Sequence, residues 1–94
     1  MASGAIKQAI KIVRITTSSF DVNNNANTFV SVDATLSGYK AVGIVGITGS
    51  NNSGLAYYEY CIVNQTDARV YVRNISGTDK TGVTLKLDVL YVPS

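Results

Sequence analysis

Histidine and tryptophan are absent from this chain, and cysteine and proline each occur only once. Without histidine the commonest general base and metal ligand is missing, which argues against most nucleophilic and zinc-dependent catalysis. A single cysteine excludes an intramolecular disulfide and a zinc site built from several thiolates. We expect that residue, Cys61, to be a small buried hydrophobic side chain within a strand.

Charged residues are also scarce, since they make up 15% of the 94 residues, whereas roughly 25% is typical of soluble domains. The net charge is +2 and the basic residues are scattered, so we expect no nucleic-acid partner. The apolar runs are too short to cross a bilayer, and the N-terminus shows no signal-peptide core, so we expect no membrane insertion. The polar surface consists mainly of Ser, Thr, Asn and Gly, which suits contact with sugars or burial in an oligomer.

The clearest positive signal is an alternation of apolar and polar residues near the end of the chain. From Val83 to Tyr91 every second residue is apolar, and residues 84, 86 and 88 between them are polar. Other stretches share this two-residue period of a half-buried strand. The predicted strands cover residues 10–17, 28–36, 40–48, 55–64, 69–74 and 83–92.

Short loops between successive strands favour antiparallel pairing. We therefore predict one all-β domain over residues 10–94, a single antiparallel β-sandwich of jelly-roll-like type with about six to seven strands. Residues 1–9 are expected to form an N-terminal arm or linker.

The predicted strand 40–48 is apolar on both faces, which is typical of a strand that is central in a sandwich or lies against another subunit. We expect Val42 and Ile44 to face one way, and Ala41, Val45 and Ile47 to face the other. Gly43 and Gly46 weaken a strand unless a ring or a neighbouring chain approaches the backbone closely. These features favour a homo-oligomer, with a trimer preferred.

The best candidate binding site is a group of aromatic and basic residues on two strands joined by the turn at 64–68. Pairing around that turn places Tyr60 or Cys61 beside Tyr71. Aromatic rings flanked by arginine suit a sugar that stacks on a ring and binds the cations, whereas cross-strand packing and a subunit interface are alternative explanations. The predicted ligand-binding residues on these strands are Tyr57, Tyr58, Tyr60, Arg69, Tyr71 and Arg73.

Two loops are rich in side-chain amides, which bind sugar hydroxyls but also stabilise turns. We include Asn51 and Asn52 among the candidate ligand-binding residues, and note the run Asn23–Asn25. Oxygen atoms of residues 21–24 are an alternative calcium site, although they do not match the twelve-residue calcium loop.

The carboxylates are dispersed, and Asp33 with Glu59 is the one pair to examine for glycoside hydrolysis. The glycines at 43, 46 and 49 do not lie between a strand and a helix, so they do not form a phosphate loop. We therefore predict a protein that is not an enzyme, with no cofactor and no metal site.

Three segments resemble a known kind of protein: 36–46 (LSGYKAVGIVG), 67–74 (DARVYVRN) and the closing strand 83–92, which ends in Leu90-Tyr91-Val92. Together, over about residues 28–92, they are similar to small all-β domains at the C-termini of tail, fibre and baseplate proteins of phages and prophages of gut bacteria. The resemblance implies a non-enzymatic virion domain, usually homotrimeric, that either binds the host surface or locks neighbouring parts together, and that leaves the cell by lysis. The alternatives are a purely structural part, such as a capsid decoration or baseplate connector, and a bacterial lectin-like module.

Overall fold

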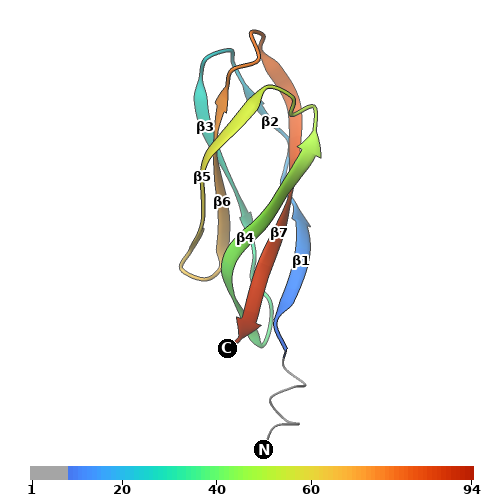
Figure 1. Cartoon of the computed structure of the whole chain (residues 1–94), viewed down its shortest axis with the longest axis vertical. Helices are drawn as coiled ribbons and strands as arrows, with labels where there is room; N and C mark the ends of the chain where they lie inside the picture. The colour runs from blue at the N-terminus through green and yellow to red at the C-terminus, as the bar shows by residue number, and fades with distance from the viewer. Residues whose placement is uncertain (1–8) are drawn as a thin grey trace, which may run out of the picture.

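The computed structural model describes residues 9–94 and contains seven strands in that range (Figure 1). It shows no helix long and apolar enough to cross a membrane among these residues. The arm predicted for residues 1–9 lies outside the described part except for its last residue. The strands are β1 (Lys11–Thr16), β2 (Phe20–Val22), β3 (Asn27–Asp33), β4 (Tyr39–Ser50), β5 (Leu55–Val63), β6 (Asp67–Asn74) and β7 (Lys80–Pro93).

The strands form two antiparallel sheets that pack face to face, which confirms the predicted β-sandwich (Figure 1). In the first sheet β7 is central: β4 pairs with one edge, and β1 and β2 pair in succession with the other. In the second sheet β6 is central between β3 and β5. Each sheet therefore has an outer face that no strand of residues 9–94 covers.

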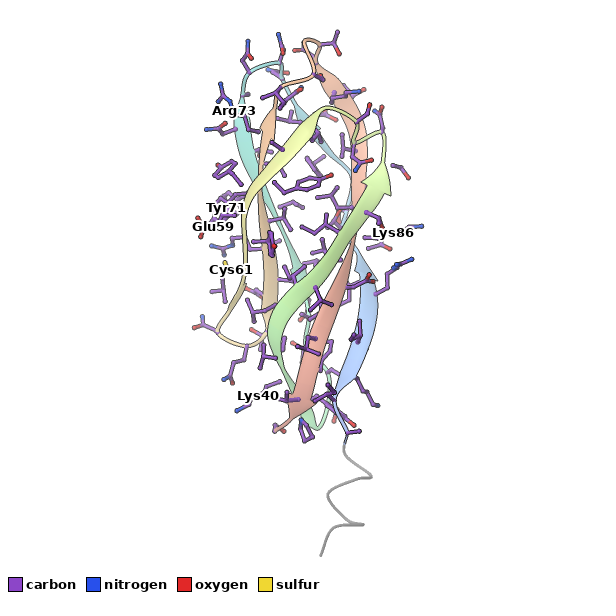
Figure 2. All side chains as sticks on the ribbon, viewed as in Figure 1. Lys40, Glu59, Cys61, Tyr71, Arg73 and Lys86 are labelled. Carbon is purple, nitrogen blue, oxygen red and sulfur yellow. The ribbon has the colours of Figure 1, made fainter. Side chains whose placement is uncertain are left out.

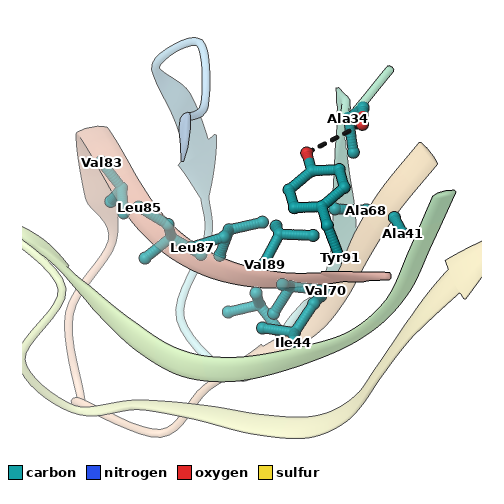
Figure 3. Close-up of a cluster of buried hydrophobic side chains, with 11 residues drawn as sticks. Ala34, Ala41, Ile44, Ala68, Val70, Val83, Leu85, Leu87, Val89 and Tyr91 are labelled. Carbon is teal, nitrogen blue, oxygen red and sulfur yellow. Dashed lines mark hydrogen bonds between the residues drawn. The ribbon is translucent and has the colours of Figure 1, made fainter. Parts of the chain in front are cut away.

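The core lies between the two central strands, as their alternation predicts (Figure 3). The inward residues of β7 and β6 are almost completely excluded from solvent, while the residues between them point outward. Burying each large aliphatic side chain contributes about 1.5–3 kcal/mol, so these two strands provide most of the hydrophobic stabilisation. The inward residues are Val83, Leu85, Leu87, Val89 and Tyr91 on β7, and Ala68, Val70 and Val72 on β6.

In β4 the side chains do not face in the directions that the sequence predicted. Register shifts at Val42 and Val45 insert two β-bulges into its pairing with β7. Each bulge adds one residue, so that Ala41, Ile44 and Ile47 share the inner face at a spacing of three. Val42 and Val45 are 46% and 56% exposed, and β4 is an edge strand of its sheet rather than a central one.

The short strand β2 lies between the predicted strands 10–17 and 28–36, where no strand was predicted. Val22 is 3% exposed and packs inward, although the residues on both sides of it are polar. A strand of three residues is too short for a two-residue period to appear in the sequence. Its position is held by Asp21, whose carboxylate accepts a hydrogen bond from the Gly82 amide at 2.9 Å.

Tyr91 connects the core of β7 to the segment that follows β3. Its hydroxyl donates a 2.8 Å hydrogen bond to the Ala34 carbonyl, and the residue is 1% exposed (Figure 3). Burial, with a smaller contribution from the negative charge of Asp33, raises the pKa of Tyr91. The neutral phenol is thus the form that the folded chain favours.

We expect Tyr91→Phe to lower the free energy of unfolding by about 1 kcal/mol at neutral pH, because the Ala34 carbonyl loses its partner. The pKa of Tyr91 is higher in the folded chain than in the unfolded chain, where it is about 10. The stabilisation is therefore complete below about pH 10 and is lost as the pH rises through the folded-state pKa. Urea unfolding at neutral and alkaline pH should show a smaller alkaline loss in the variant; equal losses would contradict this assignment.

Candidate functional site

The outer face of the β3–β6–β5 sheet carries most of the predicted binding residues in a regular grid. Its middle row consists of Phe29, Tyr71 and Glu59, which are paired across the three strands. Above and below Tyr71 on β6 lie Arg73 and Arg69, which pair with Asn27 and Ser31 of β3. Figure 2 shows Glu59, Tyr71 and Arg73 projecting from this sheet away from the core.

Three aromatic rings meet at the centre of this face. The ring centroid of Tyr71 lies 5.6 Å from that of Phe29 and 6.1 Å from that of Tyr58, and both pairs are tilted. Phe29 and Tyr58 are 54% and 55% exposed, although aromatic side chains usually bury their surface. The rings therefore present an apolar platform to solvent, and we call Phe29, Tyr58, Arg69 and Tyr71 the aromatic platform.

Tyr58 reaches the platform because of a β-bulge. The pairing of β5 with β6 shifts between Tyr57 and Glu59, which leaves Tyr58 as the extra residue. The predicted neighbours of Tyr71 were Tyr60 or Cys61, and this was wrong. The turn is tighter than 64–68: Val63 pairs with Asp67, and Asn64 and Gln65 adopt left-handed φ values of 53° and 63°.

Arg69 is held within the platform. Its guanidinium carbon lies 5.1 Å from the Phe29 ring centroid, and its Nη1 atom donates a 3.5 Å hydrogen bond to the Tyr71 hydroxyl. This hydrogen bond raises the pKa of Arg69, so the side chain stays cationic. Its Nε atom is buried and has no hydrogen-bond partner among the described residues. The cation is thus positioned by aromatic contacts rather than neutralised by a carboxylate.

Arg73 provides a second cation on the outer face of β6, on the other side of Tyr71 from Arg69. Its Nη1 atom donates a 2.8 Å hydrogen bond to Oδ1 of Asn27 on the neighbouring strand. Arg73 is exposed, and its partner is an uncharged amide. Two arginines therefore flank Tyr71, and Glu59 of β5 is the acidic residue in the row between them.

The other predicted tyrosines do not join the platform. Tyr57 is half-buried, packs against the core, and its hydroxyl accepts a 2.7 Å hydrogen bond from Nδ2 of Asn52. Tyr60 is 52% exposed and lies at the open side of the sandwich between β5 and β4. There it lines a shallow hollow of about 200 Å³ together with Ile44, Val45, Gly46 and Ile47.

The loop amides are mainly structural. Nδ2 of Asn51 donates to the Thr81 carbonyl, and Asn51 has a left-handed φ of 56°. The amide of Asn52 is engaged by Tyr57, as described above. In the other loop, Oδ1 of Asn24 accepts a 3.1 Å hydrogen bond from the Gly77 amide. These contacts join loops at one end of the sandwich, away from the platform.

The carboxylate pair considered for glycoside hydrolysis is not brought together. Asp33 and Val63 are both paired with Asp67, on opposite edge strands, and Glu59 lies four residues from Val63 along β5. Strand geometry therefore separates the Cα atoms of Asp33 and Glu59 by roughly 15 Å. In the segment considered for calcium, Oδ1 of Asp21 and Oδ1 of Asn24 each accept a hydrogen bond from a backbone amide. Within residues 9–94 no group of three or more His, Cys, Asp or Glu side chains is placed to hold a metal ion. Cys61 was predicted to be buried, but it pairs with Arg69 on the outer face of the sheet and is only half-buried.

Phe29 is the platform residue that the sequence prediction left out. In the predicted strand 28–36, Val30 and Val32 recur with a period of two, and both pack against the core. The same alternation puts Phe29 on the outward face with Ser31, so an exposed aromatic was already visible in the pattern. Comparisons of the chain with protein-family models, with curated proteins and with solved structures find no match.

Proposed function

We propose that this chain is a non-enzymatic domain of a phage or prophage virion that binds carbohydrate on the host surface through the aromatic platform. The observation that carries the proposal is the cluster of exposed Phe29 and Tyr58 around half-buried Tyr71, with the Arg69 cation fixed beside it. Tyrosine and arginine are also the residues that most often carry binding energy at protein surfaces.

The platform suits a pyranose ring that carries a carboxylate. The apolar face of a sugar has C–H groups that match the negative face of an aromatic ring. Beside the rings, Arg69 and Arg73 provide planar donor groups, and a carboxylate accepts two parallel hydrogen bonds from such a group. Glu59 on the same face provides an acceptor for sugar hydroxyls. We therefore expect a uronic acid to bind more tightly than the neutral hexose.

The assignment to a virion rests on the sequence resemblance of residues 28–92, and release by host lysis follows from it. A non-catalytic role is supported by the distance between Asp33 and Glu59, since paired carboxylates of glycosidases lie only about 5–9.5 Å apart. A purely structural connector is the second candidate, and the exposed aliphatic side chains of Ile12 and Val42 on the other sheet favour it.

The test compares tyrosines of the platform with Tyr60, which is as exposed as Tyr58 but lies elsewhere. Tyr71→Ala and Tyr58→Ala remove platform rings and should each weaken binding of a uronic-acid oligosaccharide by about tenfold or more, which is about 1.4 kcal/mol. Tyr60→Ala is the matched control, because Tyr60 is as exposed as Tyr58 but lies at the hollow beside β4.

Isothermal titration calorimetry would measure these affinities, with the neutral oligosaccharide of the corresponding hexose as a second ligand. A glycan array would extend the search to other host sugars. Binding that survives Tyr71→Ala, or that is lost equally in Tyr60→Ala, would refute the platform as the binding site. An array with no binding by the wild-type chain would favour the structural connector.

A further inference from the structure

On the outer face of the β3–β6 pair, two rows with a cation lie on either side of an aromatic row. Along β6 the paired rows are Arg69 with Ser31, Tyr71 with Phe29, and Arg73 with Asn27. The rise of a strand puts successive rows roughly 7 Å apart, and the Cα atoms of the two arginines roughly 13 Å apart. We call these three rows the cationic strip. A ligand that contacts both cations must extend along β6 over more than one sugar unit.

Both cations of the strip are held by uncharged partners. Arg69 lies against the Phe29 ring and donates to the Tyr71 hydroxyl, and Arg73 donates to the side chain of Asn27. Neither arginine forms an ion pair with another of residues 9–94. A guanidinium has five N–H groups, so each arginine keeps donors for an anionic ligand. Because both side chains are already positioned, less conformational entropy is lost when an anion binds.

Glu59 makes the middle row unfavourable for an anionic group. It pairs with Tyr71 from the β5 side, is exposed, and projects from the same face in Figure 2. No cation within residues 9–94 forms an ion pair with it. Its carboxylate therefore repels a second carboxylate in this row, whereas it accepts hydrogen bonds from hydroxyl groups. An uncharged sugar unit suits the middle row, and acidic units suit the rows on either side.

Two further carboxylates limit the strip beyond Arg69. Asp33 and Asp67 pair with each other in the next row along β3 and β6. The residues before and after Asp67 in the ladder alternate with the buried core positions, so this row belongs to the same outer face. An acidic sugar unit placed there would meet two like charges. The strip therefore accommodates about three units of a glycan rather than a polyanion of any length.

We infer that the ligand is an acidic glycan in which carboxylate-bearing and uncharged sugar units alternate, and that Glu59 selects for this alternation; both points rest on the sugar binding proposed above. Acidic units bind Arg69 and Arg73, and the uncharged unit between them packs on the rings of the middle row. A glycan with a carboxylate on every unit places one of them beside Glu59. A glycan with a single carboxylate uses only one of the two cations.

The test uses three trisaccharides that differ in their carboxylates: one at each end, one at a single end, or one on all three units. Isothermal titration calorimetry of the wild-type chain at low ionic strength should give the tightest binding for the trisaccharide with two terminal carboxylates. We expect it to bind about fivefold more tightly than the singly acidic one, as for one exposed ion pair. Against the fully acidic one we expect about threefold, because like charges at such range repel by a similar amount.

Variants assign these preferences to residues. Arg69→Gln and Arg73→Gln should each weaken binding of the trisaccharide with two terminal carboxylates by about fivefold. Lys86→Gln is the matched control, because it removes the same charge from an exposed position on the other sheet and should leave binding unchanged. Glu59→Gln should abolish the preference over the fully acidic trisaccharide, since the amide accepts hydrogen bonds without repelling an anion.

The outcomes separate this inference from the proposed function. Equal wild-type affinity for the doubly and singly acidic trisaccharides would overturn the two-cation arrangement while sugar binding by the platform stands. A preference for the fully acidic trisaccharide, or a preference against it that survives Glu59→Gln, would overturn the role of Glu59. A wild-type chain that binds none of the three would refute the proposed function, and the alternating ligand with it.

Discussion

Asn74→Ala is expected to lower the free energy of unfolding by about 3 kcal/mol or more, a large share of the 5–15 kcal/mol typical of a whole domain. Asn74 ends β6 and is 0% exposed. Its Nδ2 atom donates to the carbonyls of Val22 and Thr78 at 2.9 and 2.8 Å. Its Oδ1 atom accepts from the amide and the hydroxyl of Ser76 at 2.9 and 2.7 Å.

These four bonds use the full capacity of the side-chain amide, and they join β2 to the connection between β6 and β7. Alanine would leave the Val22 carbonyl and the Ser76 amide without partners, whereas the Thr78 carbonyl keeps a 2.9 Å hydrogen bond from the Ser76 hydroxyl. Each buried group that loses its partner costs about 1–3 kcal/mol. Asn23→Ala in the exposed loop is the control and should change stability by less than about 0.5 kcal/mol. Urea unfolding followed by circular dichroism would measure both. A loss of less than about 1 kcal/mol for Asn74→Ala would mean that water replaces the side chain.

Leu87→Ala is expected to cost about 3 kcal/mol, within the range of 2–5 kcal/mol for fully buried leucines. Leu87 is 0% exposed at the centre of β7, where it faces the second sheet. Truncation removes apolar contacts and leaves a cavity that strands held by partners on both edges cannot easily close. Lys86→Ala, one residue earlier and on the outward face, should change stability by less than about 0.5 kcal/mol.

The contrast between these neighbours tests the alternation itself. If residues 83–91 were not in a strand with one buried face, then positions 86 and 87 would not differ so sharply. Equal losses for Leu87→Ala and Lys86→Ala in urea unfolding would be incompatible with the observed sandwich.

The two central strands are the part of the fold that sequence reasoning predicted best. Their inward residues alternate strictly over many positions, so one register satisfies every residue and a shift by one would expose them all. Strand β4 was harder because two bulges change its spacing from two to three. A bulge depends on the partner strand as well as on local sequence, and the glycines beside Val42 and Val45 were the visible sign of irregularity.

The candidate site was likewise predicted correctly where a strand is regular and wrongly where a turn or a bulge sets the pairing. Outward placement of Arg69, Tyr71 and Arg73 follows from alternation within β6, and it is confirmed. Which residue lies beside Tyr71 depends on the length of the turn after Val63 and on the bulge at Tyr58. Neither the turn length nor the bulge can be obtained from a two-residue period. For this reason Tyr60 was assigned to the site although it lies at the hollow beside β4.

The two outer faces of the sandwich differ in the side chains they expose. One carries exposed aromatic rings with a positioned cation, and the other carries the exposed aliphatic side chains of Ile12 and Val42.

The most direct test of the proposed binding face is an NMR titration of the ¹⁵N-labelled chain with a uronic-acid oligosaccharide. Binding at the aromatic platform predicts that the largest amide shifts occur at Phe29, Tyr58, Arg69 and Tyr71, with little change around Tyr60 or in the loop 23–25. Shifts concentrated at either of those two places, or no shift at saturating oligosaccharide, would contradict it.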